Sequence, residues 1–171
     1  MKKVLVVGDS NTWGYDPRDY LQKYDYSYVD YLNDLVPDYK FFVDAQNGRL
    51  LRDVMHETWN LENLDLVYVM LGSNDLMHYY DTNQVVSFMK TLLKSIAKEK
   101  VLILCPPVLK IDSFEMESKA LNVAYKQLGY LYVDANPLPM SFDGVHLSQE
   151  GHKMLANKIY EYIKKDSGIK T

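Results

Sequence analysis

The sequence has a single cysteine, no long apolar run and no excess of positive charge. With Cys105 alone an intrachain disulfide is excluded, which fits a reducing compartment. No segment approaches the ~20 apolar residues that a membrane helix needs. The apolar run 4–7 behind the two N-terminal lysines is too short for the core of a signal peptide. We therefore expect a cytoplasmic protein.

The charge of the chain is mildly negative, because 19 lysines and arginines face 23 aspartates and glutamates, for a formal net charge of -4. The lysines form no basic stripe, so nothing in the charge predicts binding to nucleic acid or to an anionic membrane. Tyrosine is abundant, with 15 residues, and exposed aromatic rings would suit a homo-oligomer. We expect neither nucleic acid nor membrane as a partner.

The 171 residues suit one domain with one core, spanning 1–171. Hydrophobic residues make up 47% and charged residues 25%, which is typical of a globular protein. We find no internal repeat and no low-complexity segment.

Short apolar runs alternate along the chain with stretches of helical periodicity. Alternating strands and helices, with strands apolar on both faces, predict a parallel sheet covered on both sides. We therefore predict a three-layer α/β/α, flavodoxin-like fold with five parallel strands in the order 2-1-3-4-5. The predicted strands are 4–7, 41–43, 66–71, 101–104 and 130–133, and the predicted helices are 28–36, 50–59, 85–96, 121–128 and 155–163.

Polar residues gather where the predicted strands end, which is where ligands bind in such sheets. Ser10 follows the first strand, where its hydroxyl can project from the edge of the sheet. The surrounding residues 8–11 are equally typical of a turn or a helix cap. Ser10 is a candidate nucleophile only if a base lies nearby.

Asp143 lies three residues before His146, so the carboxylate can accept from one ring nitrogen while the other acts as base. The same pair is also common in ordinary surface loops. Asn74, after the third strand, could offer its amide to an oxyanion or simply close an Asx-turn. Gly48, after the second strand, could offer its N–H because a missing side chain allows close approach.

Taken together, these segments resemble the SGNH, or GDSL-type, hydrolase family. The resemblance rests on four motifs in the right order: Gly8-Asp9-Ser10, Gly48, Gly72-Ser73-Asn74-Asp75 and Asp143-Gly144-Val145-His146. Within the family the chain is similar to the bacterial arylesterase and acyltransferase-like branch, through residues 8–14, residues 64–72 and the Cys105-Pro106-Pro107 sequence.

The resemblance implies a catalytic triad of Ser10, His146 and Asp143, and an oxyanion hole formed by the Ser10 N–H, the Gly48 N–H and the Asn74 amide. It implies neither a cofactor nor a metal. The substrate would be a small-molecule ester, with acetyl or other short acyl groups preferred. Lysophospholipid or thioester hydrolysis and acyl transfer would use the same site.

Four aromatic residues lie near the candidate loops and could line an acyl or aryl pocket, or could simply pack the loops on the sheet. They are Trp13, Tyr15, Tyr79 and Tyr80.

Two other readings remain open. A non-catalytic flavodoxin-like module could hold a flavin or phosphate at the same sheet edge, although it would have no use for Asp143 and His146. A degenerate hydrolase could keep the motifs with a blocked pocket.

Overall fold

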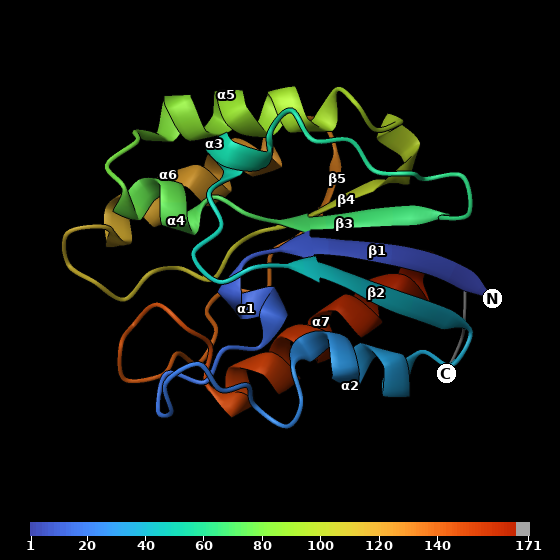
Figure 1. Cartoon of the computed structure of the whole chain (residues 1–171), viewed down its shortest axis with the longest axis horizontal. Helices are drawn as coiled ribbons and strands as arrows, with labels where there is room; N and C mark the ends of the chain where they lie inside the picture. The colour runs from blue at the N-terminus through green and yellow to red at the C-terminus, as the bar shows by residue number, and fades with distance from the viewer. Residues whose placement is uncertain (167–171) are drawn as a thin grey trace.

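The computed structural model describes residues 1–166 and contains one five-stranded parallel sheet in the order β2-β1-β3-β4-β5 (Figure 1). The strands are β1 (Lys2–Gly8), β2 (Tyr39–Ala45), β3 (Leu66–Met70), β4 (Val101–Leu104) and β5 (Leu131–Val133). The predicted α/β class and strand order are confirmed. The polar segments that follow β1, β2 and β3 therefore lie at one edge of the sheet.

Helices cover both faces of this sheet (Figure 1). The helices are α1 (Ser10–Trp13), α2 (Tyr28–Leu35), α3 (Leu51–Val54), α4 (Ser73–Met77), α5 (Thr82–Leu93), α6 (Glu115–Lys126) and α7 (Gln149–Asp166), with a 3-10 turn at Lys98–Lys100. α2 and α7 pack on one face, whereas α3, α5 and α6 pack on the other.

The interior strand β1, between β2 and β3, shows why both faces must be covered. Val4 and Val6 are completely buried under α2 and α7, whereas Leu5 and Val7 are buried under the opposite layer. Successive side chains of a strand point to opposite faces, so an uninterrupted apolar run places apolar surface on both. Two apolar clusters, one on each face, thus hold the sheet.

Two parts of the predicted helix pattern were wrong. The helix predicted over 50–59 ends at Val54, and Trp59 instead donates its indole N–H to Asp44 at the end of β2, at 2.7 Å. The helices α1 and α4 were not predicted, because four or five residues are too few for apolar periodicity to show. Both begin within one residue of a predicted site residue.

The lengths and compositions of the helices show whether any of them could cross a membrane. None of the helices formed by residues 1–166 combines the length and the apolar character needed to cross a bilayer.

Candidate active site

Ser10 is the first residue of α1, directly beyond the carboxyl end of β1. Asp9 caps this short helix, because its carboxylate accepts from the Asn11 N–H at 3.0 Å. α1 folds back so tightly that a Cβ on Gly8 would lie 2.0 Å from the Thr12 hydroxyl oxygen. The glycine in the Gly-Asp-Ser motif is therefore a steric requirement of the turn that presents Ser10.

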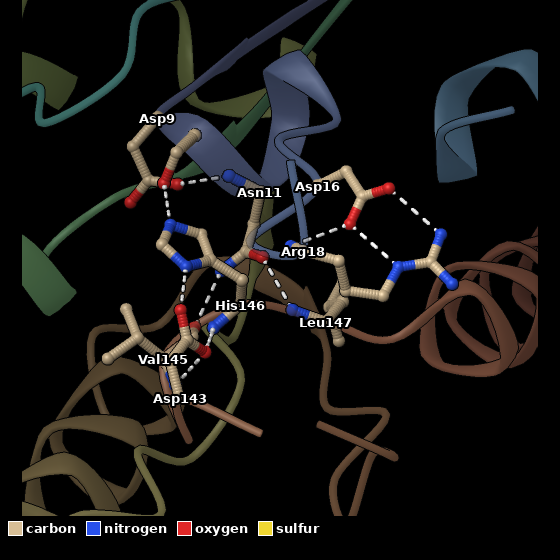
Figure 2. Close-up of polar contacts among 9 residues, drawn as sticks. Asp9, Asn11, Asp16, Arg18, Asp143, Val145, His146 and Leu147 are labelled. Carbon is tan, nitrogen blue, oxygen red and sulfur yellow. Dashed lines mark hydrogen bonds and ion pairs between the residues drawn. The ribbon is translucent and has the colours of Figure 1, made fainter. Parts of the chain in front are cut away.

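The three residues predicted as a triad form a continuous hydrogen-bonded chain. His146 Nε2 lies 3.0 Å from Ser10 Oγ, and His146 Nδ1 lies 2.5 Å from Asp143 Oδ2. Figure 2 shows the imidazole of His146 between Asp143 and the start of α1. This is the geometry in which one ring nitrogen can take a proton from the serine while the other is held by the carboxylate.

A tight turn carries Asp143 and His146. It is closed by the Ser141 N–H, which donates to the His146 carbonyl at 2.7 Å. Gly144 at its tip has φ +70°, and a Cβ there would lie 2.5 Å from the Lys110 carbonyl oxygen. The backbone of Lys110 in turn donates to the Gly144 carbonyl at 2.8 Å. The turn is thus pinned against the segment that follows β4.

The Asp143 carboxylate is held in its ionised form. Burial opposes ionisation, but the backbone N–H groups of Val145 and His146 both donate to Asp143 Oδ1 at 3.0 Å, and the His146 ring contacts Oδ2. Together these contacts keep the pKa of Asp143 below its ordinary value. The carboxylate can therefore orient the ring of His146.

Gly48 and Asn74 lie with Ser10 and His146 around one cavity of about 410 Å³, which we call the Ser10 cavity. It is lined by Ser10, Tyr15, Leu21, Asn47, Gly48, Asn74, Met77, Val145 and His146. Four of the five residues predicted for the triad and the oxyanion hole therefore line this cavity, and Asp143 joins them through its contact with His146. Leu21 and Met77 were not predicted there.

The family comparison decides the class of protein. Residues 6–154 match the model of the GDSL-like lipase/acylhydrolase family. The chain belongs to this family. It is therefore a carboxylic ester hydrolase. No curated protein matches it in sequence.

Solved structures of the same fold support the GDSL-type architecture. The aryl esterase of M. smegmatis has a TM-score of 0.81 at 19% identity, covering 96% of this chain and 99% of that one. A carbohydrate acetylesterase family member from Sinorhizobium meliloti has a TM-score of 0.80 at 22% identity, covering 99% and 100%. A lipase/acylhydrolase from Enterococcus faecalis has a TM-score of 0.78 at 22% identity, covering 97% of each chain. At these identities the likeness establishes the fold.

In this GDSL-family hydrolase, Asn11 joins the two ends of the site. Its Oδ1 accepts from the Leu147 N–H at 2.9 Å, and its Nδ2 donates to the Val145 carbonyl at 3.2 Å (Figure 2). Only 4% of Asn11 is exposed. Asn11 therefore ties α1, which carries Ser10, to the two residues that flank His146. We did not predict this role, because nothing in the sequence links residue 11 to residues 145–147.

Replacing Asn11 with alanine should loosen the contact between Ser10 and His146. We expect kcat to fall by roughly 10- to 100-fold, because small misplacements of reacting groups are costly. We expect a loss of about 2–3 kcal/mol in the free energy of unfolding from the unpaired backbone groups. Ester-hydrolysis kinetics and urea unfolding measure the two effects.

Asn33→Ala is the matched control. The side chain of Asn33, on α2, also makes two hydrogen bonds to the backbone, both to Phe41 of β2, and neither residue lines the Ser10 cavity. It should lose stability and keep kcat. Equal falls in kcat for both variants would contradict a positioning role for Asn11.

The amide of Asn74 is held by two acceptors. Its Nδ2 lies 3.3 Å from Asp9 Oδ2 and 3.1 Å from the Arg49 carbonyl oxygen. A side-chain amide has two N–H bonds and both face protein acceptors, so an oxyanion would share one of these N–H bonds with its protein acceptor. Asp9 thus positions Asn74 next to Ser10, and it does so from a site where burial raises the pKa of Asp9 to about 6.

Because its pKa is raised, ionised Asp9 weakens the fold above about pH 6, and this cost disappears as the pH falls toward 3.8, where both folded and unfolded chains are protonated. Relative to wild type, Asp9→Asn should therefore gain about 2–3 kcal/mol in the free energy of unfolding between pH 4 and pH 8, since each pKa unit corresponds to ~1.4 kcal/mol. Contacts that the substitution changes at every pH cancel from this difference. Urea unfolding at pH 4, 6 and 8 measures the difference, and a gap that does not shrink with acidity would contradict the assignment.

The four predicted aromatic residues separate into two groups. Tyr15 lines the Ser10 cavity, its ring centroid 4.7 Å from that of His146, and Trp13 packs beside Tyr15 at 6.3 Å. Tyr79 and Tyr80 instead line another cavity with Phe114, of about 260 Å³. Of these three tyrosines, Tyr15 lines the Ser10 cavity, whereas Tyr79 and Tyr80 do not.

A cavity of about 390 Å³ lies between α6 and the segment after β5 and includes Lys126 and Asp134, which form an ion pair at 2.6 Å. Within residues 1–166, no three histidine, cysteine, aspartate or glutamate side chains gather as a metal site would require.

Proposed function

We propose that this GDSL-family hydrolase cleaves small-molecule esters with a short acyl group, acetyl above all, or aryl esters, through a Ser10-His146-Asp143 triad. One observation carries the proposal: His146 lies within hydrogen-bond distance of both Ser10 Oγ, at 3.0 Å, and Asp143 Oδ2, at 2.5 Å. A flavin- or phosphate-binding module would have no use for this chain of contacts.

In the first half of the reaction, Ser10 Oγ attacks the ester carbonyl while His146 Nε2 takes its proton. The negative charge then grows on the carbonyl oxygen. The Ser10 N–H, the Gly48 N–H and the Asn74 amide are the proposed donors to it, and the position of all three residues around one cavity supports this assignment. His146 then passes its proton to the departing alcohol, which leaves an acyl-enzyme.

In the second half, water attacks the acyl-enzyme with His146 again as base, and Ser10 is regenerated. Asp143 remains ionised throughout and stabilises the charged ring. An alcohol could replace water, so acyl transfer would use the same groups. The Ser10 cavity, about 410 Å³, has room for a short acyl group together with the alcohol portion of the ester.

A p-nitrophenyl ester series from acetate to palmitate tests the proposal together with a fluorophosphonate probe. We expect the highest kcat/KM for acetate, a fall toward palmitate, and a single probe adduct that peptide mass spectrometry places on Ser10. A folded protein that neither hydrolyses any ester nor reacts with the probe would favour the binding-module reading.

Asn74→Ala should lower kcat by roughly 10²- to 10³-fold, the usual cost of one oxyanion donor, with a smaller change in KM. The reason is that an oxyanion donor acts mainly in the transition state. Steady-state kinetics with p-nitrophenyl acetate measure both constants.

Asn83→Ala, on the exposed surface of α5, is the matched control and should leave kcat unchanged. If Asn74→Ala raised KM and kept kcat, Asn74 would bind the ground state instead of the oxyanion.

A further inference from the structure

Residues 15–24 form an ordered loop beside the Ser10 cavity. The Asp16 N–H donates to the Gln22 carbonyl at 3.0 Å, the Tyr24 N–H donates to the Gly14 carbonyl at 2.9 Å, and Tyr15 and Lys23 pair as an antiparallel bridge. At the turn, the Asp16 carboxylate accepts from the Arg18 guanidinium at 2.9 and 2.8 Å (Figure 2). The loop is thus closed on itself by backbone and side-chain contacts.

Leu21 is the unusual residue of this loop. It has φ +58°, a left-handed backbone conformation that L-residues with large side chains rarely adopt. It is also 57% exposed, so burial in the core does not explain it. The loop nevertheless places Leu21 in the lining of the Ser10 cavity. Unfavourable backbone conformations that persist without a packing role are typical of ligand sites.

Tyr15 is the second residue of this loop that lines the Ser10 cavity. Its position beside His146 indicates which part of an ester would lie next to the loop. Its ring lies against the ring of His146, with centroids 4.7 Å apart. His146 delivers its proton to the alcohol oxygen as the alcohol departs, so the alcohol portion of the ester must lie on the His146 side. The proposed oxyanion donors Gly48 and Asn74 would contact the carbonyl oxygen instead.

We propose that Tyr15 and Leu21 form a subsite for an apolar, preferably aromatic, alcohol portion of the ester, with Leu21 as the residue that determines this selectivity. The inference rests on the proposed function and adds which part of the ester, the alcohol portion, the enzyme recognises. Tyr15 offers an aromatic face and Leu21 an exposed apolar branch, both of which an aromatic ring would cover. A small, polar alcohol would leave Leu21 in water.

The chemistry restricts where this subsite can act. In acylation, the bond from Ser10 Oγ to the acyl carbon forms, the bond from that carbon to the alcohol oxygen breaks, and the serine proton passes through His146 to the alcohol. In deacylation the alcohol is absent and water supplies the oxygen. A change at Leu21 should therefore alter kcat/KM, which includes acylation, and leave the hydrolysis of a given acyl-enzyme unchanged.

The test compares benzyl acetate with methyl acetate, because they share the acyl group and differ in the alcohol. For Leu21→Ala we expect kcat/KM for benzyl acetate to fall about 10-fold, a typical loss for apolar groups removed from a pocket, and for methyl acetate to change less than 2-fold. Transfer of the acetyl group to added benzyl alcohol, relative to water, should fall by a similar factor, since it is the reverse of acylation.

Two further variants separate a change in ester selectivity from a loss of stability. Leu21→Gly removes the same side chain and relieves the positive φ, so it should show the same change in selectivity with at least the stability of Leu21→Ala. Tyr20→Ala, at a neighbouring residue that is 79% exposed, should keep the wild-type ratio of the two esters. Thermal unfolding checks that all three variants are folded.

The possible results distinguish this inference from the proposed function. Equal falls for both esters, or a shift in acyl-chain preference at a constant benzyl-to-methyl ratio, would overturn the alcohol subsite while the ester hydrolase stands. A wild-type protein that cleaves no ester and takes up no fluorophosphonate would overturn both.

Discussion

Replacing Ser10 with alanine is expected to lower kcat for p-nitrophenyl acetate by about 10⁴- to 10⁶-fold, as the loss of the nucleophile does in other serine hydrolases. Without the hydroxyl no acyl-enzyme can form, and only the oxyanion donors and binding remain. Stability should be nearly unchanged, because the alanine fits the same turn at the start of α1 and His146 loses only one hydrogen bond. Steady-state assays measure kcat, burst kinetics measure the formation of the acyl-enzyme, and thermal unfolding measures stability.

Ser87→Ala, an exposed serine on α5, is the matched control and should behave as wild type. A pre-steady-state burst of p-nitrophenol should be present in the wild type and absent in Ser10→Ala. If Ser10→Ala kept more than a few per cent of wild-type turnover in a purified, folded protein, Ser10 would not be the nucleophile.

His146→Ala should lower kcat by a similar factor, on the order of 10⁴- to 10⁶-fold. The hydroxyl of Ser10 then has no base, since His146 Nε2 is the ring nitrogen that lies 3.0 Å from it. Groups that act as a unit are not additive, so the double variant of Ser10 and His146 should be no slower than either single variant. Kinetics on the three proteins with the same ester measure this directly.

His56→Ala, at an exposed position after α3, controls for the loss of a histidine and should retain wild-type kcat. A double variant that is slower than both single variants by the product of their factors would mean that Ser10 and His146 act independently. Labelling by the fluorophosphonate should also be lost in His146→Ala, because the probe needs an activated serine.

The sheet could be predicted from the sequence because each strand is an apolar run that must be covered on both faces. Val4 and Val6 illustrate this, since they are fully buried under helices that the 3.6-residue periodicity also indicated. Local patterns failed where a distant contact decides the structure. The helix predicted to reach Trp59 ends early, and Trp59 binds Asp44 on β2.

The candidate site was predicted from its sequence motifs. The structure adds the distances between the side chains and their contacts with residues far away in the sequence. The distances between Ser10, His146 and Asp143 support their proposed roles. Asn11 was missed because its partners lie 134 and 136 residues away. Leu21 was missed because a leucine gives no sign that its backbone is left-handed. Proximity in sequence does not fix which cavity a residue lines, since Tyr79 and Tyr80 line a cavity other than that of Ser10.

The hydrogen bond between Ser10 and His146 joins residues 136 positions apart, and this separation bears on synthesis by the ribosome. At ~5–20 residues per second, the serine is made roughly 7 to 27 s before the histidine. During this interval its hydroxyl has no base, and the nascent chain cannot cleave esters. Hydrolytic activity should therefore begin only after residue 147 has emerged and closed onto Asn11, so the onset of activity would report when the segment that carries His146 docks on α1.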